Sequence, residues 1–223
     1  MPSALDRQHG RLPWPTPDEL DAAQRTVYDR IVGGPRASTS PAFRLTDAAG
    51  RLEGPFNSML VNPEVGDALQ QLGAAIRYGT ALPDRCREIA ILTLAVERRS
   101  NFEWYAHARV GQRCGLTVDE LTALHDRGGV ASLSPTERLV RRAVTALCRT
   151  GDLDDALHAD LADALGRYQL AELITLAGYY DLLALSLRVW RTPLPSGETE
   201  PFDSTDVSAA RHLEPVERSH GKH

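Results

Sequence analysis

The segment LPDRCREIAILTLAVERR, residues 82–99, places the strongest constraint on the fold. Its apolar residues, including those at 89, 92 and 96, have a spacing compatible with the 3.6-residue period of an α-helix. Pro83 suits the first turn of such a helix, where a missing backbone N–H costs nothing. Because so much of the segment is apolar, we predict that it forms a central helix of the domain.

Further helical segments surround this one, each bounded by Gly, Pro or a Ser, Thr or Asp cap. They cover residues 16–34, 62–79, 100–115, 117–128, 134–151, 154–166 and 169–190. No alternating run of β-branched residues stands out between them, so the predicted fold class is all-α. The Pro-, Ser- and Gly-rich passage at 35–55 is interpreted as an irregular loop, and long loops in compact domains are often functional.

Length and composition favour one domain with loose ends. The 223 residues, 42% of them hydrophobic, suffice for one good core, which we assign to residues 1–192. The polar segment 193–223 has little to bury and is interpreted either as disordered or as an arm laid across a neighbouring subunit.

Charge and hydropathy argue against two classes of partner, nucleic acids and membranes. A net charge of −5 without a long basic block argues against nucleic acid as a ligand class. The N-terminus lacks the features of a secretory signal, and the stretch IAILTLAV is too short to span a bilayer. We therefore expect a cytoplasmic protein without a membrane partner.

The three cysteines, Cys86, Cys114 and Cys148, are widely spaced and odd in number. That pattern fits neither a disulfide framework nor a zinc knuckle nor a CxxC redox pair. The simplest interpretation is that they are buried free thiols.

The stretch ERRSNFEWYAHARVG, residues 97–111, concentrates acid, imidazole and aromatic groups. If a helix runs over residues 101–113, Glu103 and His107 are four apart and share one face, with Trp104 on the adjoining stripe. An apolar wall formed by Trp104 would raise the pKa of a neighbouring carboxyl. The stretch is therefore a candidate proton-transfer site.

A structural interpretation of the same residues competes with this one. Ser100 and Glu103 have the spacing of a capping box, in which the glutamate would bond its own helix terminus. Glu–His pairs four residues apart are also common on helices without function. The pair Glu103 and His107 lacks the HExxH pattern, and no further His or Cys lies at ligand spacing, so we predict no metal site.

Glu88 is a second acid of interest, because it lies beside the apolar stripe of the segment 82–99. Burial would raise its pKa unless a base pairs with it. The structural alternative is an ion pair within the helix to Arg85, three residues earlier.

A family resemblance favours the functional interpretation of these residues over the structural one. The order LPDRCREIAILTLAVERRSNFEWYAHARVGQRCGLTVDELTAL resembles the core of the carboxymuconolactone decarboxylase and alkylhydroperoxidase D (AhpD) superfamily. The segments GPFNSMLVNPEV, SPTERLVRRAVTAL and ELITLAGYYDLLALSLRVW resemble the flanking parts, so the likeness extends over about residues 11–193. The resemblance implies an AhpD-like helical bundle that assembles into trimers or hexamers.

The resemblance also assigns site residues. The proton-relay acid of the family corresponds to Glu88 and its histidine to His107. The two cysteines of the peroxidase branch correspond to Ser100 and Glu103, so both sulfurs are missing. A thiol peroxidase needs a thiolate and a resolving thiol, which argues against that activity.

The resemblance to the decarboxylase branch implies a lyase that uses no metal or organic cofactor and acts on small acidic lactones. As a hypothesis, His107 is the general acid or base, Glu88 orients it or exchanges protons with it, and Glu103 is a second proton carrier or steering charge.

Substrate contacts are assigned on the same basis. Arg85 is the first candidate for binding a substrate carboxylate, with Arg77 and Arg109 as alternatives. The pocket-lining candidates are Trp104, Tyr105, Phe56 and Asn57.

Two alternatives stay open. The same acid–histidine pair could serve an isomerisation, dehydration or cyclisation in a catabolic or secondary-metabolite pathway, because fold does not fix function. The chain could also be a non-catalytic oligomeric binding protein.

Overall fold

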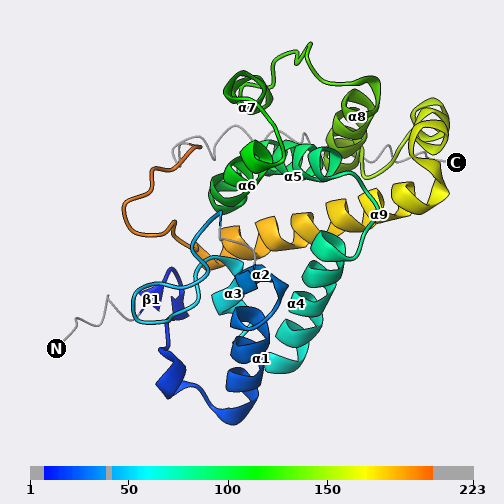
Figure 1. The fold of residues 1–223 in the computed structure, drawn as a ribbon. Coiled ribbons are helices and arrows are strands. Elements are labelled where there is room, and N and C mark those ends of the chain that lie inside the picture. The colour runs from blue at the N-terminus through cyan, green and yellow to red at the C-terminus, as the bar shows by residue number, and fades with distance from the viewer. Residues whose placement is uncertain (1–7, 39–41, 203–223) are drawn as a thin grey trace, which may run out of the picture.

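The computed structural model describes residues 8–38 and 42–202 of the chain. Helices dominate them, which confirms the predicted all-α class (Figure 1). The α-helices are α1 (Ala22–Val32), α2 (Pro35–Ser38), α3 (Pro55–Ser58), α4 (Pro63–Tyr78), α5 (Asp84–Arg98), α6 (Asn101–Arg113), α7 (Val118–His125), α8 (Pro135–Thr150) and α9 (Asp155–Trp190). Strands β1 (Gln8–His9) and β2 (Leu12–Pro13) form a small antiparallel hairpin, and Pro17–Glu19 form a 3₁₀ turn.

Helix α5 is the central element, as its apolar sequence predicts. It packs against α6, α8 and α9, which surround it in Figure 1. Its completely buried side chains include Ile89, Ile91, Leu92 and Leu94. Residues on several faces of α5 are buried, as expected for a helix in the core of a domain. Because α5 is enclosed by other helices, the polar side chains that project from it are held in fixed positions.

Helix α9 contains a sharp break at Gly166, where φ is 74° and ψ is 163°. The sequence predicts two helices that meet at this glycine, and the positive φ explains the break, because glycine adopts that region without a Cβ clash. The part after the break runs beneath α5 and α6 in Figure 1. By length and composition α9 could cross a membrane, and half of its most apolar window is buried inside the protein.

The start of α1 differs from the sequence expectation. Helical structure was predicted from Thr16, but the α-helix begins at Ala22 after the N-cap Asp21, whose carboxylate accepts a hydrogen bond from the Gln24 N–H at 2.8 Å. Leu20 is extended between the 3₁₀ turn and α1. Two capping boxes follow each other here, and each one starts its own helical element.

The passage 35–55 is mainly irregular, apart from α2 and a β-bridge between Thr46 and Leu52. The β1–β2 hairpin and the residue that follows it, which sequence periodicity did not predict, hold this loop in place. The ring nitrogen His9 Nε2 lies 3.3 Å from the Glu53 carboxylate, and Trp14 Nε1 donates to the Leu52 carbonyl at 2.7 Å. Strands of two residues are too short for alternation to be seen in sequence.

The described part of the polar segment, residues 193–202, packs on its own chain. Glu198 pairs with Arg109 of α6 at 2.7 Å, and the Phe202 ring stacks on His125 with centroids 5.0 Å apart. The remaining part of that predicted tail, residues 203–223, lies outside the described residues.

Candidate active site

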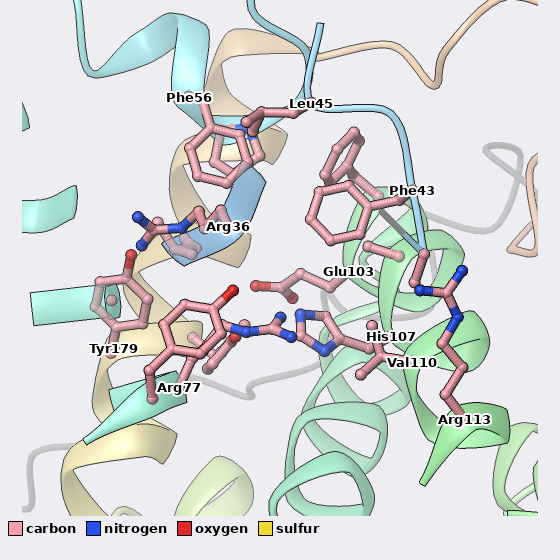
Figure 2. Close-up of a pocket in the computed structure, with 18 residues that line it drawn as sticks. Arg36, Phe43, Leu45, Phe56, Arg77, Glu103, His107, Val110, Arg113 and Tyr179 are labelled. Carbon is pink, nitrogen blue, oxygen red and sulfur yellow. The ribbon is translucent and has the colours of Figure 1, made fainter. Parts of the chain in front are cut away.

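A pocket of about 200 Å³ opens between α4, α6, the second half of α9 and the loop after α2. Its walls are mostly aromatic and aliphatic, from Phe43, Leu45, Phe56, Phe102, Val110 and Leu183. Its polar groups are Arg36, Arg77, Glu103, His107 and Arg113 together with tyrosines 78, 179 and 180. In Figure 2, Glu103, His107 and Arg77 point toward one another in the middle of the pocket, with Phe43, Leu45 and Phe56 on one side. A few charged groups in an apolar enclosure are typical of a small-molecule site.

His107 and Glu88 form a buried pair at this pocket. His107 Nδ1 lies 2.7 Å from Glu88 Oε2, and both side chains are almost completely buried. A carboxylate can only accept, so the imidazole donates from Nδ1 and leaves Nε2 without a proton. Burial lowers the pKa of His107, against the opposing effect of Glu88. The imidazole is therefore neutral at pH 7, as a general base must be.

Glu103 is unusual because neither carboxyl oxygen has a hydrogen-bond partner among the described residues. Burial raises the pKa of Glu103 to about 8. The nearby Ser100 hydroxyl opposes that increase, although its position does not meet hydrogen-bond geometry. The predicted capping box is absent, since Ser100 makes no side-chain cap. Glu103 therefore lines the pocket and is protonated at neutral pH.

Arg77, from the last turn of α4, supplies the central positive charge. Burial alone would lower the pKa of Arg77, but the Tyr180 hydroxyl and the Glu88 carboxylate raise it above its ordinary value. Its Nε has no hydrogen-bond partner among the described residues. Burial also raises the pKa of Tyr180, so this tyrosine is a neutral phenol; its ring meets His107 edge to face at 5.1 Å.

The structure brings together four of the residues that the sequence nominated. His107, Glu103 and Phe56 line the pocket, and Glu88 lies directly behind His107. These four residues belong to helices α3, α5 and α6.

Arg85, the first candidate for binding a substrate carboxylate, does not line this pocket. Its guanidinium bonds Glu137 at 2.7 Å, Glu120 at 3.1 Å and the Gly115 carbonyl. The predicted intrahelical pair with Glu88 does not form either, because α7 and α8 offer these carboxylates instead. The alternative Arg77 occupies the pocket, whereas Arg109 is paired with Glu198.

Three predicted lining residues also lie elsewhere. Trp104 packs edge to face against His125 and Phe202, on the outer side of α6. Tyr105 packs on Phe102 and under Arg109. The Asn57 amide donates to the Pro13 carbonyl at 2.9 Å. The apolar surroundings of Glu103 therefore come from other residues than Trp104.

Sequence reasoning missed Phe43, Phe102, Tyr179 and Tyr180 as pocket residues. The tyrosines belong to GYYDLLALSLRVW, whose pattern indicates core or interface. Their distance in sequence from α6 is about 70 residues, so only the packing of α9 reveals them. Among the described residues, no group of three or more His, Cys, Asp and Glu side chains is placed to hold a metal ion.

Comparison with known proteins agrees with this architecture. Residues 63–146 match the model of the carboxymuconolactone decarboxylase family. That range contains Arg77, Glu88, Glu103 and His107, and it ends inside α8. No curated protein matches the chain.

Solved structures share the fold at low identity. An alkylhydroperoxidase AhpD core protein, an uncharacterized peroxidase-related protein from Ralstonia eutropha JMP134, has 13% identity and a TM-score of 0.67, covering 84% of this chain and 93% of its own. A putative antioxidant defence protein AhpD from Agrobacterium tumefaciens has 18% identity and a TM-score of 0.56, covering 64% and 99%. A variant of the debrominase Bmp8, in complex with 2,3,4-tribromopyrrole, has 12% identity and a TM-score of 0.58, covering 78% and 87%. Residues 63–146 thus match the carboxymuconolactone decarboxylase family model, and the chain shares the helical fold of AhpD-like proteins.

Proposed function

We propose that this protein is a cofactor-free acid–base enzyme that decarboxylates a small carboxylated lactone or a related carbonyl compound. The observation that carries the proposal is the combination of a buried neutral histidine paired with Glu88 and a second buried acid, Glu103, in one pocket. Two titratable groups whose environments give them opposite roles are the usual arrangement for acid–base catalysis.

The chemistry follows from the protonation states. A substrate carboxylate would be held by the Arg77 guanidinium, which is cationic and central in the pocket. The bond from carbon to carboxylate breaks, carbon dioxide leaves, and the electron pair moves onto the carbon conjugated with the carbonyl. Glu103, neutral at pH 7, then delivers its proton to that carbon. The Glu103 carboxylate then regains one proton from solvent, with His107 Nε2 as the proton carrier and Glu88 fixing the orientation of the ring.

A thiol peroxidase is not favoured. Ser100 and Glu103 occupy the positions of the two redox cysteines, and all three cysteines of the chain lie in the described part and outside the residues that line the pocket. Burial raises the pKa of Cys86 and Cys148 to about 11, which disfavours a thiolate.

The proposal predicts loss of turnover on removal of either member of the buried pair. Carbon dioxide release and solvent deuterium incorporation would be measured with carboxymuconolactone and a panel of β-keto and lactone acids. His107→Ala and Glu88→Gln should lower kcat by about two to four orders of magnitude, as loss of a general acid or base does, while helicity is unchanged. His125→Ala is the matched control, because this histidine contacts Phe202 outside the pocket.

Three results would contradict the proposal. Equal turnover in wild type and His107→Ala would exclude the assigned site. Binding of panel members without turnover or deuterium exchange would favour a non-catalytic binding protein. Exchange without release of carbon dioxide would instead favour an isomerase, dehydratase or cyclase that uses the same pair.

A further inference from the structure

A second cavity in the domain shares no lining residue with the first. It has a volume of about 550 Å³ and lies between α5, α8, the segment after α7 and the start of α9. Five arginines line it: Arg127, Arg138, Arg141, Arg142 and Arg149. Glu97 is the single carboxylate among its described lining residues.

The arginines are concentrated by helix geometry. Positions 138, 142, 145 and 149 repeat at intervals of four, three and four, so they share one face of α8, with Thr145 between the arginines. Like charges four residues apart destabilise a helix. Such a stripe creates a local positive potential that attracts anions, although the net charge of the whole chain is −5.

The protein itself compensates only part of this charge. Arg149 binds Glu97 through two bonds of 2.8 and 3.0 Å, and Arg127 lies 3.9 Å from the same carboxylate. Glu97 is thereby engaged on the side of α5. In the described part of the chain, the Arg142 guanidinium makes no hydrogen bond or ion pair, and its side chain is exposed.

Main-chain carbonyls fix other guanidinium groups while leaving donors open. Arg141 donates to the Gly128 carbonyl at 2.8 Å, Arg127 to the Val96 carbonyl at 3.2 Å, and Arg138 to the Leu133 carbonyl. Each guanidinium carries five N–H donors, so most of them are left for a ligand. A planar fork held in this way is suited to bidentate binding of phosphate or carboxylate.

The floor of the cavity is apolar, with Val96, Leu124, Val130 and Leu157. The volume falls within the usual range of small-molecule sites. We infer that this cavity binds a small polyanion, a metabolite that presents a phosphate group or several carboxylates to the arginines of α8.

Isothermal titration calorimetry with inorganic pyrophosphate and, separately, citrate tests the inference on the full-length protein. We expect one site per chain, with affinity that falls as sodium chloride rises from about 0.05 to about 0.5 M. The relative affinity of the two probes distinguishes a phosphate-bearing ligand from a polycarboxylate. The double substitution Arg138→Gln and Arg142→Gln should weaken binding at least about tenfold.

Arg167→Gln is the matched control, because it removes an exposed arginine of α9 that does not line the cavity. The inference is wrong if neither probe binds, if the double variant binds as wild type does, or if the control loses as much affinity. It is also wrong if the double variant changes the oligomeric state while neither probe binds, since the arginines would then serve a contact between copies. None of these outcomes depends on turnover at the first pocket.

Discussion

At the scale of single residues, Glu103 is the most informative position. Its carboxyl is buried, has no hydrogen-bond partner among the described residues and faces His107 and Arg77 across the pocket (Figure 2). A protein gains no stability from such a group, because burial of an unpaired acid is unfavourable. Buried acids with a strongly raised pKa are characteristic of functional sites.

The pH dependence of stability tests the protonation state of Glu103. Between the ordinary pKa of 4.5 and the raised value of about 8, the folded protein holds a proton that the unfolded chain has released. The contribution of Glu103 to the stability of wild type therefore falls as the pH rises through this window, with a slope approaching about 1.4 kcal/mol per pH unit. Glu103→Gln should remove this slope and be more stable than wild type at pH 8. Urea denaturation at pH 5 to 8 measures it, and parallel pH profiles of the two proteins would contradict the assignment.

At the scale of elements, packing between helices decides which side chains reach the pocket. Arg85 shows this, because it lies one turn before Glu88 on α5 yet joins α5 to α7 and α8 through Glu120 and Glu137. An intrahelical view of α5 could not foresee carboxylates that arrive from residues 120 and 137. The bridge therefore contributes to stability, and Arg77 is the arginine of the two that lines the pocket.

Arg85→Ala is accordingly predicted to lower the free energy of unfolding by about 1–2 kcal/mol, since two nearly buried carboxylates lose their partner. The kcat on any substrate of the panel should stay within about twofold of wild type, because Arg85 does not line the pocket. Denaturant unfolding and steady-state kinetics check the two statements. Arg77→Ala serves for comparison and should raise KM strongly. A larger rise in KM for Arg85→Ala would contradict the proposal that Arg77 binds the substrate carboxylate.

At the N-terminus of α3, the backbone of Gly54 lies close to the ring of Phe102. Gly54 has φ 60° and ψ −139°, and a Cβ there would lie 2.1 Å from the ring of Phe102, which lines the pocket. Gly54→Ala combines backbone strain with displacement of that ring and should cost about 3 kcal/mol of stability. Gly151→Ala, with φ 75° and no neighbouring atom, should cost only about 1 kcal/mol. Equal losses in thermal or urea unfolding would show that Phe102 adapts freely.

At the scale of the whole molecule, the second half of α9 presents apolar side chains outward. Ile174, Leu182, Leu185 and Val189 are 45%, 44%, 63% and 46% exposed. Their spacing of eight, three and four residues keeps them near one stripe. Exposed apolar surface of this kind marks an interaction site, and we propose that it takes part in the trimer or hexamer expected from the family resemblance.

Leu185→Glu is expected to shift the protein toward smaller species, because a charge would be buried in the contact. Light scattering across a dilution series measures the change, with circular dichroism to verify helicity. Val118→Glu, at a 66% exposed position on α7, is the control and should leave the mass unchanged. A wild type that is monomeric at micromolar concentration would contradict the assembly.

The sequence predicted the long helices, the central position of α5 and the location of the acid and the histidine on α5 and α6. Periodicity, caps and glycines are local signals, and Gly166 and the bounds of α6 agree with them. The resemblance identified Glu88 and His107, which lie 2.7 Å apart.

The three-dimensional packing shows that Glu103 lines the pocket instead of capping its helix, and that Arg77 lies there in place of Arg85. It also shows that the loop at Phe43 and the tyrosines of α9 complete the pocket walls. Each of these depends on contacts between segments far apart in the chain. The residue types do not determine such contacts, because a carboxylate can pair with any cation that lies near it. Which cation lies near depends on the packing of the whole core.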